Sequence, residues 1–173
     1  EGKQLRGIIH AAGVLDDGVL LGQKWERFER VMSAKVMGAW NLSELTRGKE
    51  LDFFVLFSSA ASVLGSPGQG NYAAANAFLD GLAAARQRRG EVGLSINWGP
   101  WGEVGLAVRE DRARHVASHG MQSMRSAEAM AAFGQLMNLR TISTMTVMPF
   151  DIDQWSLVYP QDAELPLFSE LTR

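Results

Sequence analysis

The stretch LDFFVLFSSAASVLGSPGQGNYAAANAFLDGLAAARQRRGEVGLSINWG, residues 51–99, decides the fold. It opens with an almost continuous apolar run that ends in two serines, a pattern typical of a strand buried in a parallel sheet. A Gly/Pro/Ser-rich loop at residues 61–70 leads into residues 71–89, which are rich in strong helix formers and stop at Gly90. The apolar residues 92–99 predict a second strand, so the stretch indicates a strand, a helix and a strand.

The same alternation continues on both sides of this stretch. Residues 5–13 predict another buried strand, and residues 25–46 predict an amphipathic helix that closes near Gly48. Residues 126–138 predict a helix and residues 141–151 a last strand. The pattern predicts an α/β fold with a parallel sheet, in which ligands bind outside the carboxyl ends of the strands. Three of these ends read HAAG, FSSAAS and NWGPW, which are small or polar, so we look for the chemistry there.

Composition narrows the classes of function. The chain has 173 residues, of which 46% are hydrophobic and 21% charged, as in an ordinary soluble domain. A net charge of -2 with interspersed signs predicts no nucleic-acid partner, and apolar runs such as FFVLF are too short to span a membrane. The absence of cysteine excludes disulfides and thiolate catalysis and fits a cytoplasmic location. Without an initiator methionine or a signal peptide, we expect a piece of a longer protein.

Four polar side chains are predicted to meet at the rim of the sheet. Tyr72 and Asn76 lie one helical turn apart, at the start of the helix of residues 71–89. Ser59 ends the preceding strand, and Lys35 lies among apolar residues on the inner face of its helix. A lone tyrosine at a helix end is most often a structural anchor. A phenol, a hydroxyl, an ammonium and an amide together favour proton transfer to a carbonyl oxygen.

The motifs HAAGVLDDGVL (10–20), SAKVMGAWNL (33–42), FVLFSSAASVLGSPGQGNYAAANAFLDGLA (54–83) and INWGPWGEVGL (96–106) closely resemble the ketoreductase domains of modular type I polyketide synthases, which are short-chain dehydrogenases/reductases. The resemblance covers about residues 6–155. It implies a Rossmann-like doubly wound sheet and NADPH-dependent reduction of a β-ketoacyl thioester on an acyl carrier protein.

The resemblance also implies the roles of the four side chains. Tyr72 would be the general acid, and Ser59 would hydrogen-bond the same substrate oxygen. Lys35 would support the tyrosine and the cofactor ribose, and Asn76 would hold the water of the proton relay. Most of the superfamily has lysine four residues after the tyrosine, where this chain has Asn76. Its lysine comes instead from the preceding helix, as in these ketoreductases.

The cofactor site is expected to be incomplete. No G-x-G-x-x-G turn occurs in the chain, and the resemblance places that turn and the pyrophosphate-binding strands upstream of HAAG. The expected partners are therefore the N-terminal half of the domain and other synthase domains, and we expect the chain alone to bind NADPH poorly and to be inactive. The residues expected on the nicotinamide side are Ala11, Ala12, Gly13, Lys35, Tyr72, Gly99, Pro100 and Trp101.

The resemblance further implies the stereochemistry of the product. Leu15, Asp16 and Asp17 match the LDD motif of B-type ketoreductases, with Asp17 at the diagnostic position. Leu64 stands eight residues before Tyr72, where the opposing type has tryptophan. Ala74 replaces the proline associated with epimerised substrates, which favours B1 and a D-β-hydroxyacyl product. The residues expected to control the stereochemistry are Asp17, Leu64 and Gln69.

Residues 1–155 are expected to be the C-terminal portion of the catalytic subdomain, with a lid at about residues 101–126. Residues 156–173 are expected to be a docking or linker segment. His10 ends a strand where other superfamily members often carry asparagine, and we expect a structural role for it. His115 and His119 are four residues apart but lack a third ligand, so no metal site is expected.

Three other classes of function remain possible. One is a non-catalytic structural half of a synthase reductase, which in this family lacks the serine and the tyrosine. A second is a reductase or epimerase acting on nucleotide sugars, a class that keeps lysine four residues after tyrosine. The third is a binding module, which would have no need to gather Lys35, Ser59 and Tyr72 at one rim.

Overall fold

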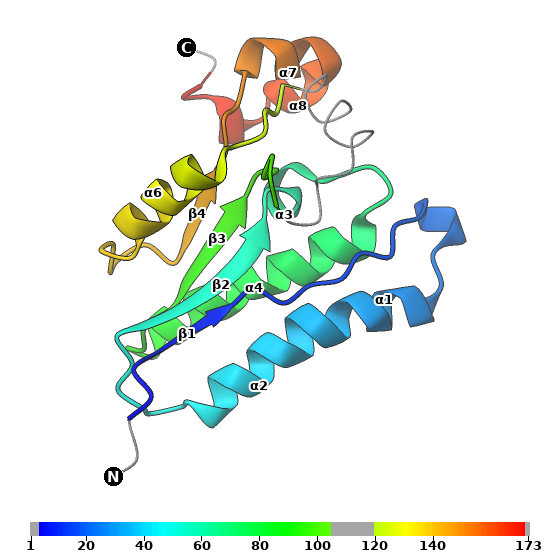
Figure 1. The fold of residues 1–173 in the computed structure, drawn as a ribbon. Helices are drawn as coiled ribbons and strands as arrows, with labels where there is room; N and C mark the ends of the chain where they lie inside the picture. Colours follow the sequence, from blue (N-terminus) through cyan, green and yellow to red (C-terminus); the bar gives the residue numbers. More distant parts are fainter. Residues whose placement is uncertain (1–3, 105–119, 172–173) are drawn as a thin grey trace. The chain divides into compact units, whose positions relative to one another are not determined.

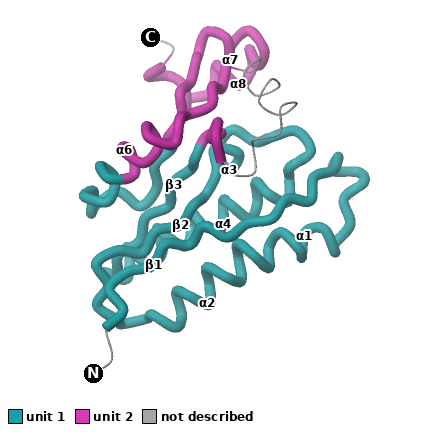
Figure 2. The backbone as a smooth tube through the Cα atoms, in the orientation of Figure 1, with its two compact units in different colours: residues 1–98, 134–146 teal, residues 99–133, 147–173 magenta. Residues whose placement is uncertain are grey.

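A computed structural model describes residues 4–104 and 120–171 of the chain. The chain forms two compact units (Figure 2). The first unit contains Glu1–Trp98 and Gly134–Thr146, and the second contains Gly99–Phe133 and Val147–Arg173. No helix in the described part of the chain is long and apolar enough to cross a lipid bilayer.

A parallel sheet forms the centre of the first unit (Figure 1). The strands β1 (Gly7–His10), β2 (Phe53–Ser59), β3 (Leu94–Trp98) and β4 (Thr144–Val147) lie in the order β1-β2-β3-β4. His10 pairs with Leu56 and Ser59 pairs with Trp98, so the carboxyl ends of β1, β2 and β3 lie at one edge. The predicted α/β class with a Rossmann-like parallel sheet is confirmed.

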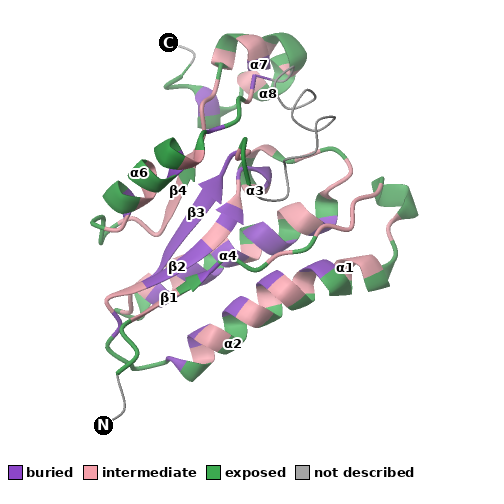
Figure 3. Cartoon of the chain, in the orientation of Figure 1, coloured by how far each residue is buried: buried purple, intermediate pink, exposed green. Residues whose placement is uncertain are grey.

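The helix α4 (Gly70–Arg88) packs on β2 and β3 and against α1 (Trp25–Met32). The strands β2 and β3 are largely buried (Figure 3) because they lie inside the sheet with α4 on one face. Each large apolar side chain buried in this core contributes about 1.5–3 kcal/mol to folding. The buried residues of the core cluster are Ala39, Leu51, Phe54, Leu56, Leu79, Leu82 and Ala83.

Two local features differ from the predicted elements. The helix expected at residues 25–46 is interrupted, because a π-helical turn (Ser33–Met37) separates α1 from α2 (Gly38–Leu45). The loop expected at residues 61–70 begins with a single helical turn, α3 (Ala61–Leu64). Ser59 Oγ accepts the amide of Ala61 at 3.2 Å and so supports the start of that turn, a local bond that leaves no periodic pattern in the sequence. A 3-10 turn (Leu20–Gly22) lies in the loop before α1.

The second unit has a core of aromatic rings. α6 (Ser126–Leu136) begins in this unit, and α7 (Ile152–Val158), α8 (Pro160–Ala163) and a 3-10 turn (Pro166–Phe168) follow β4. The rings of Phe150, Trp155 and Phe168 contact one another, with centroids 5.4–6.1 Å apart.

Part of the predicted lid falls outside the described residues, namely residues 105–119, and so do His115 and His119. The described residues on either side of this gap belong to the second unit. In that unit, isolated β-bridges join Trp101 to Met124 and Met121 to Phe150. The division at residue 155 and the docking role of residues 156–173 stay predictions.

Candidate functional site

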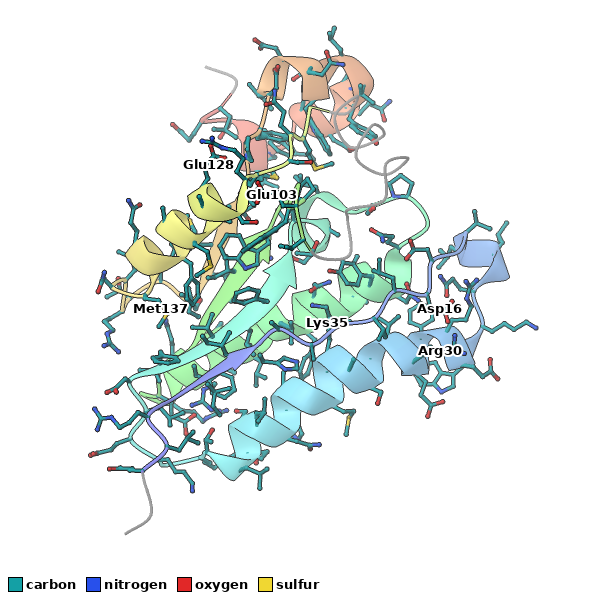
Figure 4. The ribbon with its side chains drawn as sticks, viewed as in Figure 1. Asp16, Arg30, Lys35, Glu103, Glu128 and Met137 are labelled. Atoms are coloured by element: carbon teal, nitrogen blue, oxygen red, sulfur yellow. The ribbon has the colours of Figure 1, made fainter. Side chains whose placement is uncertain are left out.

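Lys35 is buried, with only 4% of its surface exposed. It lies in the π-helical turn Ser33–Met37, on the side of the helix that faces the sheet and α4 (Figure 4). Its Nζ donates a hydrogen bond of 2.9 Å to the carbonyl oxygen of Phe57, near the end of β2. Burial lowers the pKa of Lys35 to about 8, and the negative charge of Asp80 opposes that shift. The side chain is therefore still a cation at pH 7.

Tyr72 stands in the first turn of α4 with its ring next to this ammonium. Lys35 Nζ lies 5.3 Å from the centroid of the ring, within the range of a cation–π contact. Burial raises the pKa of the Tyr72 phenol, and hydrogen bonding from the side chains of Ser59 and Asn76 acts in the opposite direction. At neutral pH the site therefore holds a protonated phenol with two polar groups beside it.

Asn76 is fully buried one turn after Tyr72, and both its side chain and its backbone carbonyl make hydrogen bonds. Its Nδ2 donates to the carbonyl oxygen of Tyr72 at 2.7 Å, and its own carbonyl accepts from Ser58 Oγ at 3.2 Å. Its Oδ1 is buried and accepts no hydrogen bond from the residues that the structure describes. A buried amide oxygen without a protein donor is suited to accept one from a water molecule.

The four side chains predicted from the sequence thus lie together in the first unit. Lys35 comes from the helix after β1, Ser59 from the end of β2, and Tyr72 and Asn76 from the start of α4. An ammonium, a hydroxyl and a phenol at one place can hold an oxygen atom and transfer a proton to it.

The sequence analysis missed Asp80, a residue of α4 that accepts hydrogen bonds from side chains near the site. Its carboxylate accepts hydrogen bonds from Ser62 Oγ at 2.7 Å, Ser95 Oγ at 2.6 Å and Asn97 Nδ2 at 2.7 Å. Asn97 Nδ2 also lies close to Ser62 Oγ. We call Asp80, Ser62, Ser95 and Asn97 the Asp80 network. It joins α3, α4 and β3. The spacing of Asp80, four residues after Asn76 and eight after Tyr72, could have revealed it, because these positions share a helix face.

The loop with the LDD motif is held firmly beside α4. Asp16 accepts hydrogen bonds of 2.6 Å from Arg27 Nε and Arg30 Nη1, which are both on α1 (Figure 4). Asn71, which is fully buried, donates from Nδ2 to the carbonyl of Asp16 at 2.9 Å and accepts the Tyr72 amide at 2.8 Å. The residue next to Tyr72 therefore fixes the loop to the first turn of α4.

The residues expected to control stereochemistry lie around this loop and the turn before α4. Gln69 Nε2 donates to both carboxylate oxygens of Asp17, at 3.2 Å each. The backbone amide of Gly18 donates to the carbonyl of Gly68 at 2.8 Å, which joins the two segments a second time. Leu64 ends α3 and is half-buried. The structure brings Asp17 and Gln69 together, and their effect on the product stays a prediction.

The residues expected to hold a cofactor fall into both units. Ala11, Ala12 and Gly13 directly follow β1, and the two alanines are exposed. Gly99, Pro100 and Trp101 belong to the second unit, where the carbonyl of Pro100 accepts the Met124 amide at 2.9 Å. Within the described residues, no three histidine, aspartate or glutamate side chains are grouped as metal ligands. The roles of these residues stay predictions.

Comparisons with known proteins identify the family. A family model described as "KR domain" matches residues 1–103. The phenolphthiocerol synthesis polyketide synthase type I Pks15/1 of Mycobacterium bovis (strain ATCC BAA-935 / AF2122/97) is 49% identical over 132 residues, which are 75% of this chain and 6% of that protein.

Solved structures agree with the family model. A structure of A-type ketoreductases from a modular polyketide synthase has a TM-score of 0.92 and 34% identity, covering 97% of this chain and 35% of the solved chain. The ketoreductase of the first module of phoslactomycin biosynthesis in Streptomyces sp. HK803 has a TM-score of 0.87 and 33% identity, covering 95% of this chain and 38% of its own. This chain thus spans little more than a third of the solved domains. It belongs to the family of ketoreductase domains of modular type I polyketide synthases.

Proposed function

We propose that this chain carries the proton-transfer residues for NADPH-dependent reduction of a β-ketoacyl thioester, bound to an acyl carrier protein, to a D-β-hydroxyacyl thioester. The observation that supports this proposal best is the position of Lys35 Nζ, 5.3 Å from the centroid of the Tyr72 ring. The side chains of Ser59 and Asn76 lie beside the same phenol and act to lower its pKa. A non-catalytic structural half would have no need for this arrangement.

Tyr72 gives its hydroxyl proton to the carbonyl oxygen of the substrate as the carbon is reduced. Burial keeps the pKa of Tyr72 raised, so the proton is present at neutral pH. The phenolate that remains is stabilised by the Lys35 ammonium beside its ring. Ser59 donates a second hydrogen bond to the oxygen as negative charge develops there, which favours the transition state over the ground state.

Asn76 and Lys35 are suited to return the proton to Tyr72. The buried Oδ1 of Asn76 has no donor among the described residues and can hold a water next to the Lys35 ammonium. A proton then passes from this water chain to the Tyr72 oxygen, with the charge of Lys35 kept constant below its pKa of about 8.

The donor set fits the nicotinamide end of NADPH. The Lys35 ammonium has three N–H donors, and in the described part of the chain one of them bonds to the carbonyl of Phe57. When the cofactor is bound, Lys35 would also donate to ribose hydroxyls, together with the Tyr72 hydroxyl. When bound, NADPH supplies the hydride that reduces the substrate carbon. The exposed alanines after β1 offer a surface without bulky side chains for the same molecule. No Gly-rich pyrophosphate turn occurs in the chain, so we propose that an upstream segment completes the site.

The test is reduction by a reconstituted domain. Residues 1–173 are co-expressed with an upstream ketoreductase segment that carries the glycine turn, and NADPH oxidation is followed with a β-ketoacyl thioester. We expect Tyr72→Phe to lower kcat at least a hundredfold to a thousandfold, about the effect of losing one oxyanion donor, without changing the fold. Full turnover by Tyr72→Phe would show that the acid is another group.

The stereochemical proposal has its own readout. The alcohol product is compared with D- and L-configured standards by chiral chromatography. We expect the D product from the unchanged chain, and a loss of selectivity in Gln69→Ala because Asp17 then loses its two hydrogen bonds from that side chain. An L product from the unchanged chain would contradict the B-type assignment.

A further inference from the structure

The helix that carries Lys35 is interrupted at this residue. The amide of Gly38 donates to the carbonyls of Ser33 and Lys35, whereas in a continuous α-helix it would donate to Ala34. The π-helical turn therefore deprives the Ala34 carbonyl of its helical donor. Such turns are rare and are found frequently at functional sites. We therefore looked for the contacts that hold the one at Lys35.

His10 lies against this part of the helix. It is the last residue of β1, is 6% exposed, and its imidazole lies beside the backbone of Lys35 and Ala34. Its Nε2 is buried and has no hydrogen-bond partner among the described residues. Burial lowers the pKa of His10 below 6.5, and the nearby charge of Lys35 acts in the same direction. At neutral pH the imidazole is therefore uncharged and adds no second positive charge beside Lys35.

Gly38 makes room for this imidazole. A Cβ at position 38 would lie 3.0 Å from His10 Cε1, closer than side chains normally pack, and 3.5 Å from His10 Nε2, at ordinary contact distance. The ring therefore rests directly on the helix backbone at the first residue after the π-helical turn. A larger residue at position 38 would push the ring away from the helix backbone.

The strand pairing connects this contact to the catalytic candidates. His10 pairs with Leu56 across β1 and β2, and the next carbonyl of β2, that of Phe57, accepts the hydrogen bond of Lys35 Nζ. The backbone of Lys35 is thus held by one strand and its ammonium by the neighbouring strand. We propose that His10 is a positioning residue, which holds the π-helical turn and thereby keeps the Lys35 ammonium next to the Tyr72 ring.

The consequence can be measured at Lys35 itself. The groups that act on its charge in the described chain are His10 at the end of β1, and Tyr72 and Asp80 on α4. None of them is altered chemically by a change at Gly38. If the turn relaxes, the Lys35 side chain gains access to water, and its pKa rises from about 8 toward its ordinary value of 10.5.

The first experiment follows the ammonium by NMR in the full chain, using lysine labelled with carbon-13 at Cε. The chain has only four lysines, so Lys35→Met assigns the signal. We expect His10→Leu and Gly38→Ala each to raise the pKa of Lys35 by about one unit or more. His10→Asn, which keeps a short polar side chain at this position, should leave the pKa of Lys35 near 8. Gly81→Ala is the matched control, because a Cβ at this exposed glycine of α4 meets nothing within 4 Å.

The second experiment measures kcat and KM of the same variants in the reconstituted domain, and this part rests on the proposed function. We expect His10→Leu and Gly38→Ala to lower kcat about tenfold, with His10→Asn and Gly81→Ala close to the unchanged chain. An unmoved Lys35 pKa in folded His10→Leu or Gly38→Ala overturns the positioning role, whatever the activity. A shifted pKa in a domain that never reduces the thioester would instead overturn the proposed function. If His10→Leu does not fold, Gly38→Ala alone decides.

Discussion

At the scale of the residue, the burial of Lys35 carries a cost in stability. Its pKa is about 8 in the folded chain and 10.5 when unfolded, so between these values the unfolded chain binds more protons. Stability therefore rises with pH across this window and is lowest below pH 8, where the buried amine is charged. Lys35 is thus kept at a cost to the fold, as expected of a residue retained for chemistry.

This cost predicts that Lys35→Met stabilises the chain. We expect its free energy of unfolding near neutral pH to rise by about 1–3 kcal/mol, and the increase in stability above pH 8 to disappear. Urea unfolding at a series of pH values measures both effects. Lys49→Met, at an exposed lysine, is the control and should change neither. A destabilised Lys35→Met would mean that the Phe57 hydrogen bond outweighs the burial of charge.

Much of the site could be predicted from residue spacing. The one-turn separation of Tyr72 and Asn76 and the apolar neighbours of Lys35 indicated that these side chains converge, and they do. The contact of His10 with the backbone of Ala34 could not be predicted, because it depends on a helical irregularity. Roles such as proton donation remain predictions, since position alone does not establish chemistry.

At the scale of the element, the Asp80 network holds α4 in register with β3. Ser95 and Asn97 are fully buried on β3, and both donate to the Asp80 carboxylate. Without that acceptor, the buried Ser95 hydroxyl would lose the acceptor that it has among the described residues, whereas Asn97 Nδ2 would keep its contacts with Ser58, Ser59 and Ser62. The same helix carries Tyr72 two turns earlier, so the network also fixes how the phenol is presented.

Asp80→Ala is therefore expected to lower the free energy of unfolding by about 3–5 kcal/mol, the range for breaking a buried charged network. Ser95→Ala removes a single hydrogen bond and should cost about 1 kcal/mol. Chemical denaturation of both variants provides the comparison. Equal costs would show that the carboxylate contributes through one bond only.

Helices and strands with a strong hydrophobic or compositional pattern could be predicted from the sequence, whereas single helical turns could not. The apolar runs that became β2 and β3 and the alanine-rich α4 are found where their composition placed them. α3 and the π-helical turn are accompanied by local contacts, such as the hydrogen bond from the Ala61 amide to Ser59 Oγ and the approach of His10 to Gly38, which leave no periodicity in the sequence.

At the scale of the whole molecule, the C-terminal segment contributes to the core of the second unit. Trp155 and Phe168 are 3% and 5% exposed and pack around Phe150. Aromatic residues spaced far apart in the sequence give no signal of such a cluster before the chain folds. Whether this segment also docks on another domain remains a prediction.

The cluster predicts a local loss of stability in Phe168→Ala. Removing a buried phenylalanine ring costs about 3–5 kcal/mol, and the ring of Phe168 contacts Phe150 and Trp155, which both belong to the second unit. Hydrogen exchange should therefore become faster in residues 120–133 and 147–171, while the amides of β2, β3 and α4 keep their protection. Leu167→Ala, at a neighbouring side chain that is 59% exposed, should leave all rates unchanged. Equal acceleration in both regions would mean that the two units unfold together, and the residues of the site would then depend on the C-terminal segment for their stability.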